Sequence, residues 1–248
     1  TAGGYIFYQD AKLRRLTRYR YNNVPSDLGG RYYYIKDGDT VFNPSFLPTM
    51  TTLDEFKCRH GLGYTIFESK KNGIKSELTL FIPQEDSVEI NQLVIKNTTD
   101  QVKNITVFSF VEWCLWNAVD DHTNFQRNLN IGEVEIDEHT IYHKTEYRER
   151  RNHFAFYFMN EKHHGFDSDR DAFLGKFRSF SQPIVVEKGK SKNSIASGNA
   201  PIGSHRYQMT LQPGESRKLI YLIGYVENDE DHKFIAPNII NKEKVTKL

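Results

Sequence analysis

The sequence predicts an all-β protein whose strands form a large antiparallel sandwich with few short helices. Short segments rich in β-branched and aromatic residues recur from end to end, and Gly, Pro, Asn and Asp stand between them. Aromatic residues make up 13% of the chain, with 14 Tyr and 17 Phe, and these residue types favour pleated sheets. Strands do not alternate with long helical segments, so the pattern argues against a doubly wound parallel sheet.

The first predicted hairpin joins Tyr32–Lys36 to Thr40–Asn43. Asp37-Gly38-Asp39 stands between them, and an Asp-Gly pair accepts the positive φ angles that a tight hairpin turn needs. Before this hairpin, Ala11–Arg20 is expected to form one helical turn or more. After it, Asn43–Asp54 is expected to be a loop.

Three longer strands are predicted in the middle of the chain. Ser76–Ile82 alternates in polarity and places Leu78 and Leu80 on one face together with Ile82. Val88–Lys96 follows a polar turn. Val102–Glu112 is apolar almost throughout, which is typical of a strand covered on both faces.

The later part of the chain supplies the remaining predicted strands: Gly132–Ile136, Thr140–Tyr147, His153–Met159, Pro183–Glu187, Arg206–Leu211 and Lys218–Val226. Residues 189–203 are rich in Ser, Gly, Asn and Lys, which predicts a loop, and Asn241–Leu248 is expected to begin a helix. Neither a repeat of fixed period nor a low-complexity tract divides the sequence. One domain is therefore the simplest prediction.

The charge composition excludes some classes of partner. The chain has 33 Lys and Arg against 32 Asp and Glu, so its net charge of +1 favours neither nucleic acid nor an anionic membrane. No apolar run reaches the roughly 18 residues of a transmembrane helix.

Cys58 and Cys114 lack metal-ligand spacing, and a chain of this length needs no disulfide to support its core. Both cysteines are expected to be reduced, buried thiols of a cytoplasmic protein.

Residues 111–130 carry the strongest functional signal. An apolar run with both tryptophans of the chain, Trp113 and Trp116, ends in a dense set of amide, acidic, His and Arg side chains. Flat apolar rings beside hydrogen-bond donors suit a sugar, which has apolar C–H faces and a rim of hydroxyls. The plain alternative is a buried strand followed by a polar turn.

Within this stretch, Gln126 and Arg127 are the best binding groups. An amide both donates and accepts hydrogen bonds, and a guanidinium offers several fixed donors to hydroxyls or phosphate. Asp120 and Asp121 beside His122 are a weaker acid/base candidate, because adjacent side chains of an extended segment point to opposite faces.

A second cluster near the amino terminus combines basic residues with Tyr and Asn: Lys12, Arg14, Arg15, Arg18, Tyr19, Arg20, Tyr21, Asn22 and Asn23. A solvated or salt-bridged face is the commonest explanation of such a run. A subunit-interface or sugar-phosphate loop and a nucleic-acid contact are the alternatives.

Two further clusters have weaker signals. Cys58–Tyr64 contains two glycines without the spacing of a phosphate-binding loop, and His60 is expected to be structural. The other cluster matches no metal-ligand spacing, so no metal site is expected from its members: His163, His164, Asp167, Asp169 and Asp171. A polar loop is predicted there instead. The sequence contains no nucleophile motif and no P-loop.

Motifs in order along essentially the whole chain resemble the N-terminal domain of cellobiose phosphorylase, an inverting disaccharide phosphorylase of glycoside hydrolase family 94. They occupy Thr1–Asn23, Asp27–Tyr32, Cys58–Thr65, Trp113–Asn128, Tyr147–Phe154, Asp169–Gly175 and Ala200–His205. The segment DRDAFLG also occurs across the wider family of disaccharide phosphorylases and cyclic glucan synthases. NNVPSDLGGRY, CRHGLGYT and NAVDDHTNFQRN point more narrowly to the cellobiose-type branch.

The resemblance implies a cytoplasmic homodimer that splits cellobiose into α-glucose 1-phosphate and glucose. Inorganic phosphate is the co-substrate and no cofactor is implied. The implied architecture is a galactose-mutarotase-like β-supersandwich over residues 1–238, a helical linker beginning at 239–248, and an (α/α)6 barrel. Phosphate is already an anionic nucleophile, so one carboxylic acid suffices for the reaction, and that acid belongs to the barrel.

The resemblance therefore assigns no catalytic residue to this chain, which is expected to be a fragment without turnover of its own. Gln126 and Arg127 are its candidates for contacts with the acceptor sugar. Candidates for the dimer contact, or for a loop near the site, are Arg14, Arg15, Arg18 and Asn23. The implied partners are a disaccharide or β-glucan substrate, a second copy, and the protein's own barrel.

Two other interpretations stay open. One is a free-standing carbohydrate-binding β-sandwich that uses Trp113, Trp116 and tyrosines as a stacking platform. The other is a purely structural or interaction domain. Within the phosphorylase interpretation, the sequence does not separate cellobiose from cellodextrin, laminaribiose or cellobionic acid.

Overall fold

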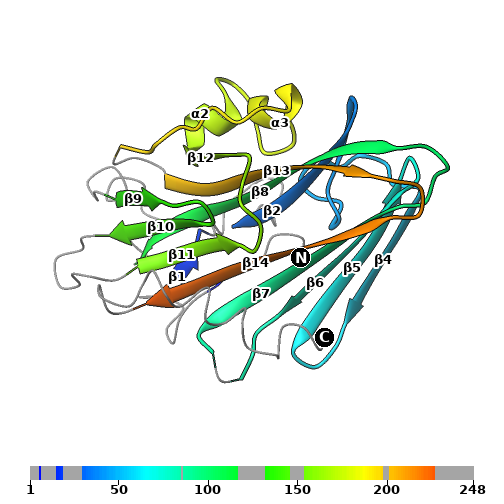
Figure 1. The fold of residues 1–248 in the computed structure, drawn as a ribbon. Helices are drawn as coiled ribbons and strands as arrows, with labels where there is room; N and C mark the ends of the chain where they lie inside the picture. Colours follow the sequence, from blue (N-terminus) through cyan, green and yellow to red (C-terminus); the bar gives the residue numbers. More distant parts are fainter. Residues whose placement is uncertain are drawn as a thin grey trace.

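Two antiparallel sheets packed face to face form the body of the molecule (Figure 1). The computed structural model describes residue 6 and residues 15–18, 30–84, 86–116, 132–145, 154–197 and 201–226. Two short helices lie outside the smaller sheet. The predicted all-β sandwich with few short helices is confirmed.

The smaller sheet has six strands among the described residues. Five of them follow the order β12 (Gly165–Asp169), β13 (Pro201–Leu211), β8 (Lys103–Trp116), β2 (Arg31–Asp37) and β3 (Thr40–Phe42). The sixth, β1 (Arg15–Thr17), pairs with the last residues of β8.

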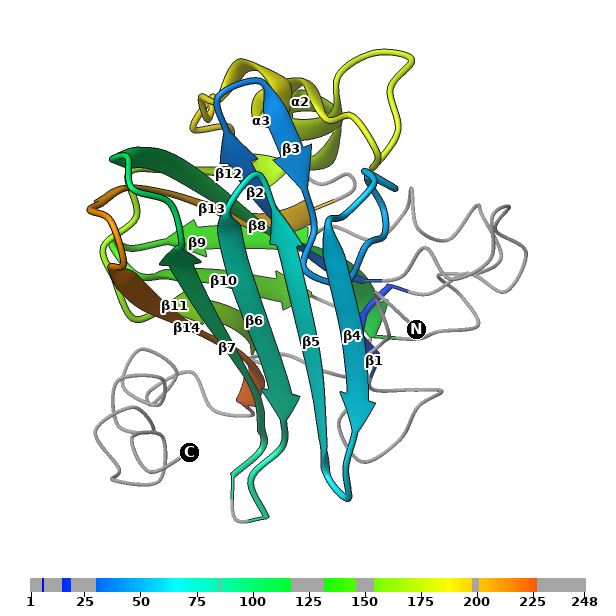
Figure 2. The ribbon, with the colours of Figure 1, turned by 90° about the vertical axis from the view of Figure 1, so that its right-hand side faces the viewer.

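The larger sheet has eight strands in the described part of the chain. Their order is β4 (Glu55–His60), β5 (Tyr64–Lys71), β6 (Ile74–Phe81), β7 (Val88–Asn97), β14 (Ser216–Val226), β11 (Phe154–Met159), β10 (Thr140–Thr145) and β9 (Gly132–Ile136). Figure 2 shows β4 at one margin of this sheet, and every residue of β4 is exposed.

Strand β8 is apolar on both faces because each face has its own neighbour. Val107, Val111 and Trp113 point into the core between the two sheets. Phe108 and Phe110 point the other way, toward the helices. The continuous apolar run predicted for this strand therefore reflects burial on both faces.

The helical layer consists of α2 (Arg170–Leu174) and α3 (Ile184–Lys188), which lie over β13 and β8 in Figure 1. Val185 and Val186 of α3 are buried against the outer aromatic face of the smaller sheet. The predicted strand at Pro183–Glu187 is wrong. Pro183, with φ −63°, precedes the first helical turn, and a short apolar run does not separate helix from strand by its period.

The expected helix over Ala11–Arg20 is also wrong where the structure describes it, because Arg15–Thr17 forms β1 and pairs with β8. Cys114 is buried as expected, but Cys58 lies exposed on β4, and both are free thiols. The expected linker at 239–248 lies outside the described residues.

Candidate functional site

The two ends of the sandwich differ. At the turn end, short connections join β2 to β3, β5 to β6, β9 to β10 and β13 to β14, over residues 38–39, 72–73, 137–139 and 212–215. Gly38 has φ 55°, so the Asp-Gly turn predicted from the sequence forms here.

At the opposite end, which we call the loop end, β8, β10 and β14 finish while β2, β11 and β13 start. The pairs Arg31↔Val111, Ile202↔Glu112 and Phe154↔Val226 fix these strand ends beside one another. The arrowheads of β10 and β14 in Figure 1 point toward this end. Residues 19–29, 117–131, 146–153 and 198–200 connect strands here and lie outside the described residues.

The candidate residues from the sequence all belong to segments attached to the loop end. Arg15 and Arg18 are described and buried at the end of β8. The remaining candidates lie outside the described residues: Arg14, Asn23, Gln126 and Arg127. Their roles remain predictions, but the strands fix where their segments leave the sandwich.

The connection from β4 to β5 also reaches the loop end, beside the turn that follows β6 (Figure 2). It exposes Leu62, and Tyr64 at the start of β5 and Ile82 on the neighbouring turn are also exposed. Apolar side chains are therefore available to a ligand or partner that approaches this end.

Two buried ion-pair groups support the loop end. On the helix side, the Glu112 carboxylate contacts Arg18 at 3.0 Å and Arg170 at 3.2 Å. Between the sheets, Arg31 Nε lies 3.0 Å from Glu89 Oε1. The sequence analysis missed these groups, since residues far apart in sequence meet only after the strands pair.

Trp113 does not offer a surface for a sugar. Its side chain is fully buried and stacks on His143, with ring centroids 5.7 Å apart. Burial lowers the pKa of His143 to about 3, so this imidazole is neutral inside the sandwich. A stacking platform that includes Trp113 is contradicted. The side chain of Trp116 is outside the described set.

Other perturbed groups lie in the same interior. Tyr33, Tyr157 and Tyr221 are buried, and burial raises the pKa of each well above the ordinary tyrosine value. The His205 ring is tilted against Tyr157 at a centroid distance of 4.9 Å, and burial lowers the pKa of His205 well below its ordinary value. Burial between the two sheets explains these shifts.

The His and Asp cluster has structural roles. Asp167 is buried and accepts hydrogen bonds from the backbone N–H groups of Lys192 and Ser194. Asp169 accepts from Ala172 N at 2.8 Å and so caps α2. In the part of the chain that the structure describes, no three His, Cys, Asp or Glu side chains gather as metal ligands.

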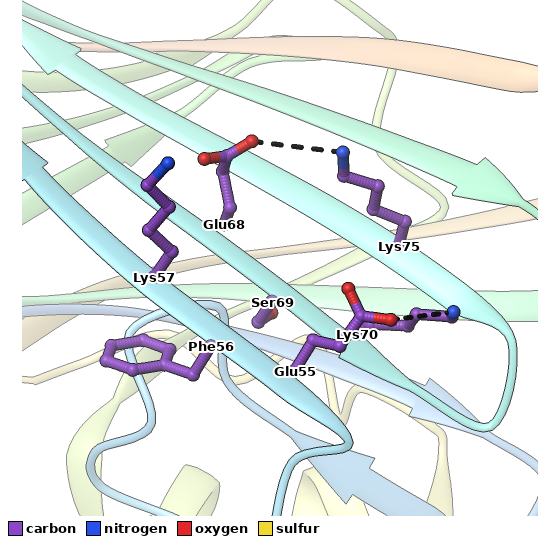
Figure 3. Close-up of a pocket in the computed structure, with 7 residues that line it drawn as sticks. All are labelled: Glu55, Phe56, Lys57, Glu68, Ser69, Lys70 and Lys75. Carbon is purple, nitrogen blue, oxygen red and sulfur yellow. Dashed lines mark hydrogen bonds and ion pairs between the residues drawn. The ribbon is translucent and has the colours of Figure 1, made fainter.

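Two hollows lie away from the loop end. Figure 3 shows a hollow of about 270 Å³ on β4, β5 and β6, where Glu68 pairs with Lys75 and Glu55 pairs with Lys70. A hollow of about 600 Å³ lies at the turn end, and its lining includes Lys36. Neither hollow brings a nucleophile and a general base together.

The described residues therefore hold a frame for a binding surface without a complete catalytic constellation. No helix among them has the length and apolar character to cross a membrane.

The sequence matches the family described as "Glycosyl hydrolase 94, supersandwich domain" over residues 1–242. The chain belongs to this family. The family 94 supersandwich resembles the N,N'-diacetylchitobiose phosphorylases of Vibrio proteolyticus and Vibrio furnissii, with 37% and 32% identity. It also resembles the solabiose phosphorylase of Paenibacillus borealis, with 30% identity.

This family 94 supersandwich corresponds to one part of those relatives. Each Vibrio alignment covers 90% of this chain and 28% of the relative. The solabiose phosphorylase alignment covers 87% of this chain and 29% of the relative. Among solved structures, a bacterial glucoamylase complexed with acarbose has a TM-score of 0.57 at 9% identity, covering 87% of this chain and 29% of that one. At that identity the likeness supports the sandwich fold alone.

Proposed function

We propose that this chain is the supersandwich domain of an inverting disaccharide phosphorylase. The observation that carries the proposal is the family 94 match over residues 1–242, together with relatives of 37%, 32% and 30% identity that are named as disaccharide phosphorylases. The absence of a nucleophile–base pair among the described residues agrees with chemistry that takes place elsewhere in the full-length protein.

The proposed reaction splits a β-linked disaccharide with inorganic phosphate. Phosphate attacks the anomeric carbon and forms the C–O bond of an α-sugar 1-phosphate, while the glycosidic C–O bond breaks. A general acid protonates the departing oxygen, which leaves as a hydroxyl of the free sugar. We place that acid in an (α/α)6 barrel of the same polypeptide.

Cellobiose is the substrate that we propose first, because the segments CRHGLGYT and NAVDDHTNFQRN resemble the cellobiose-type branch. A second candidate is N,N'-diacetylchitobiose, since two relatives at 37% and 32% identity are named for that disaccharide. Both substrates have two pyranose rings, and they differ at the 2-position, where an acetamido group replaces a hydroxyl.

We propose that the loop end contributes to the acceptor-sugar site through Gln126 and Arg127. Strand β8 ends and β9 starts at the loop end, so residues 117–131 leave and re-enter the sandwich there. An amide beside a guanidinium can satisfy both donors and acceptors on the rim of a sugar. We also propose that the full-length protein is a cytoplasmic homodimer, with the segments of Arg14 and Asn23 near the contact.

Phosphate release by the full-length protein tests the reaction. One assay supplies α-glucose 1-phosphate with glucose, and a parallel assay supplies N-acetyl-α-glucosamine 1-phosphate with N-acetylglucosamine. Release with the first pair alone supports cellobiose, and release with the second pair alone supports the second candidate. No release with either pair, combined with retained glucan binding, would instead make this chain a binding module.

The role of Arg127 is tested by Arg127→Ala in the same full-length protein. A lost charge-assisted contact should raise the acceptor KM about 10-fold or more while the donor KM changes little. Arg217→Ala is the matched control, because Arg217 pairs with Glu215 at the turn end. An acceptor KM equal to that of the control would remove Arg127 from the site. Light scattering of the full-length protein tests the homodimer.

A further inference from the structure

Glu112 holds both ends of the segment that contains residues 19–29. Its backbone N–H donates to Gly30 O at 2.8 Å, and its carbonyl accepts from Arg18 N at 2.8 Å. Gly30 N in turn donates to Arg18 O at 3.1 Å. Residues 18 and 30 are therefore fixed beside one another, and one residue of β8 fixes both.

The Glu112 carboxylate adds a second set of contacts. Arg18 Nη1 donates to its Oε1 atom at 3.0 Å. Arg170 Nε lies 3.2 Å from the same oxygen, but its N–H does not point along that line, so this contact is ionic rather than a directed hydrogen bond. Three parts of the chain therefore meet at one carboxylate: the start of the 19–29 segment, β8, and the DRDAFLG segment.

The surroundings make this arrangement sensitive to the charge on Glu112. The side chains of Glu112 and Arg18 are 9% and 8% exposed, so water does little to stabilise either charge. Arg170 is held further by the Phe180 ring, whose centroid lies 5.2 Å from the guanidinium carbon. Without the carboxylate, the nearly buried Arg18 guanidinium would lose this ion pair and would face Arg170, whose side chain is 30% exposed and also lies 3.7 Å from Asp171.

The position of Glu112 connects this group to the candidate acceptor contacts. Glu112 lies in β8 shortly before its last residue, Trp116, after which comes the segment with Gln126 and Arg127. Strand β1 covers this part of β8 through the pairs Arg15↔Trp116 and Thr17↔Trp113. A displacement of Glu112 would therefore reach both segments that leave the sandwich here.

We propose that Glu112 is a positioning residue for the acceptor-sugar site, and that it acts through Arg18 and Arg170. This inference rests on the proposed function. A small misplacement of a binding group weakens its contacts strongly. We place the donor-sugar and phosphate sites in the barrel, together with the general acid. Loss of the carboxylate should therefore affect the acceptor sugar selectively.

The test uses the full-length protein with Glu112→Gln. We expect an acceptor KM about 10-fold higher, a donor KM within about 2-fold of the wild type, and partial recovery of the acceptor KM in Glu112→Asp. Glu138→Gln is the matched control, because Glu138 pairs with Lys162 on the exposed surface. Unchanged constants in Glu112→Gln, or equal rises for acceptor and donor, would overturn the inference.

A second variant keeps the inference testable if Glu112→Gln does not fold. Arg170→Met removes the contact to the DRDAFLG segment and leaves the Arg18–Glu112 pair, so it should give a smaller rise in acceptor KM, again without a rise in donor KM. Equal constants for Arg170→Met and the wild type would then decide against the inference.

Limited trypsin cleavage after Arg20, identified by mass spectrometry, reports the anchoring without any activity. Faster cleavage in Glu112→Gln than in the Glu138→Gln control is expected. Wild-type protein inactive on every sugar pair would remove the proposed function. The cleavage rates would then still decide whether Glu112 anchors residues 19–29, and equal rates would overturn that part as well.

Discussion

The indole of Trp113 lies parallel to the imidazole of His143, with an interplanar angle of 8° and ring centroids 5.7 Å apart. Trp113 comes from β8 of the smaller sheet and His143 from β10 of the larger one, so the pair joins the two layers. Both side chains are buried, and the stack belongs to the core. The aromatic signal in residues 111–130 therefore reports, at Trp113, sandwich packing rather than a sugar contact.

His143 should make the domain less stable in acid. Its folded-state pKa of about 3 lies below the value of about 6.5 expected when unfolded, so the unfolded chain binds the extra proton. The stability that depends on the neutral imidazole is fully present above pH 6.5 and is lost as the pH falls toward 3. At pH 5 the free energy of unfolding should be about 2 kcal/mol lower than at high pH because of this group. His143→Phe, which keeps a stacked ring, should lose less stability between pH 7.5 and pH 5 in urea unfolding. His60→Gln controls for histidine removal, and equal losses in both variants would contradict the prediction.

Asp167→Asn should destabilise the segment that follows α3. The carboxylate accepts from Lys192 N at 3.2 Å, Ser194 N at 3.1 Å and Ser194 Oγ at 2.7 Å, and an amide NH₂ would face donors there. We expect a loss of about 2 kcal/mol in the free energy of unfolding. Asp171→Asn is the control, because its side chain is 89% exposed and should cost under about 0.5 kcal/mol. Similar losses in the two variants would argue against the buried contacts.

Gly203 has no space for a side chain. A Cβ atom there would lie 2.9 Å from Val111 Cγ1 and 3.1 Å from Tyr157 Cδ1, where the two sheets meet. Gly203→Ala should therefore cost about 1–3 kcal/mol in thermal or urea unfolding, as overpacking of a dense core does. Ser197→Ala, at an exposed position, is the control. A melting temperature of Gly203→Ala equal to that of the control would show that the sheets can separate at this point.

Cys58 should react with iodoacetamide much faster than Cys114 in the folded chain. Cys58 lies exposed on β4, where iodoacetamide can reach its sulfur in the folded chain. Cys114 is 3% exposed and should react only after denaturation. Peptide mass spectrometry after a short native reaction distinguishes the two, and Cys58→Ser should abolish native labelling. Labelling of Cys114 at a comparable rate would contradict the described packing of β8.

The sequence predicted strands best where turn chemistry and alternation agree. The hairpin around Gly38 and the strand Val88–Asn97 form close to their expected positions. Strand β4 was missed because both of its faces are exposed, so its mixed polar residues lack an alternating pattern. Ile184–Lys188 forms a helix because the aromatic face of the smaller sheet accepts its two valines, a tertiary effect that local pattern does not contain.

The candidate site was predictable only in part. The mixture of aromatic, amide and charged residues pointed to residues 111–130 and to the basic run near Arg18. The strand order attaches both segments to the loop end. Glu112 could not be identified, because its importance comes from Arg18 and Arg170, which are brought to it by β1 and by the end of β12. A buried carboxylate between two distant arginines leaves no local signature in the chain.

The turn end and the loop end differ in how freely the sequence can change. Register in the sheets is set by paired strands and by turns such as the one at Gly38, so residues inserted into the long connections leave the pairing intact. The paired strands can thus stay the same while the connections at the loop end change. Under the proposed function, a laboratory seeking a different acceptor sugar could recombine the loop-end segments of relatives on this frame, provided that the residues at 18, 30 and 112 are kept as the junctions.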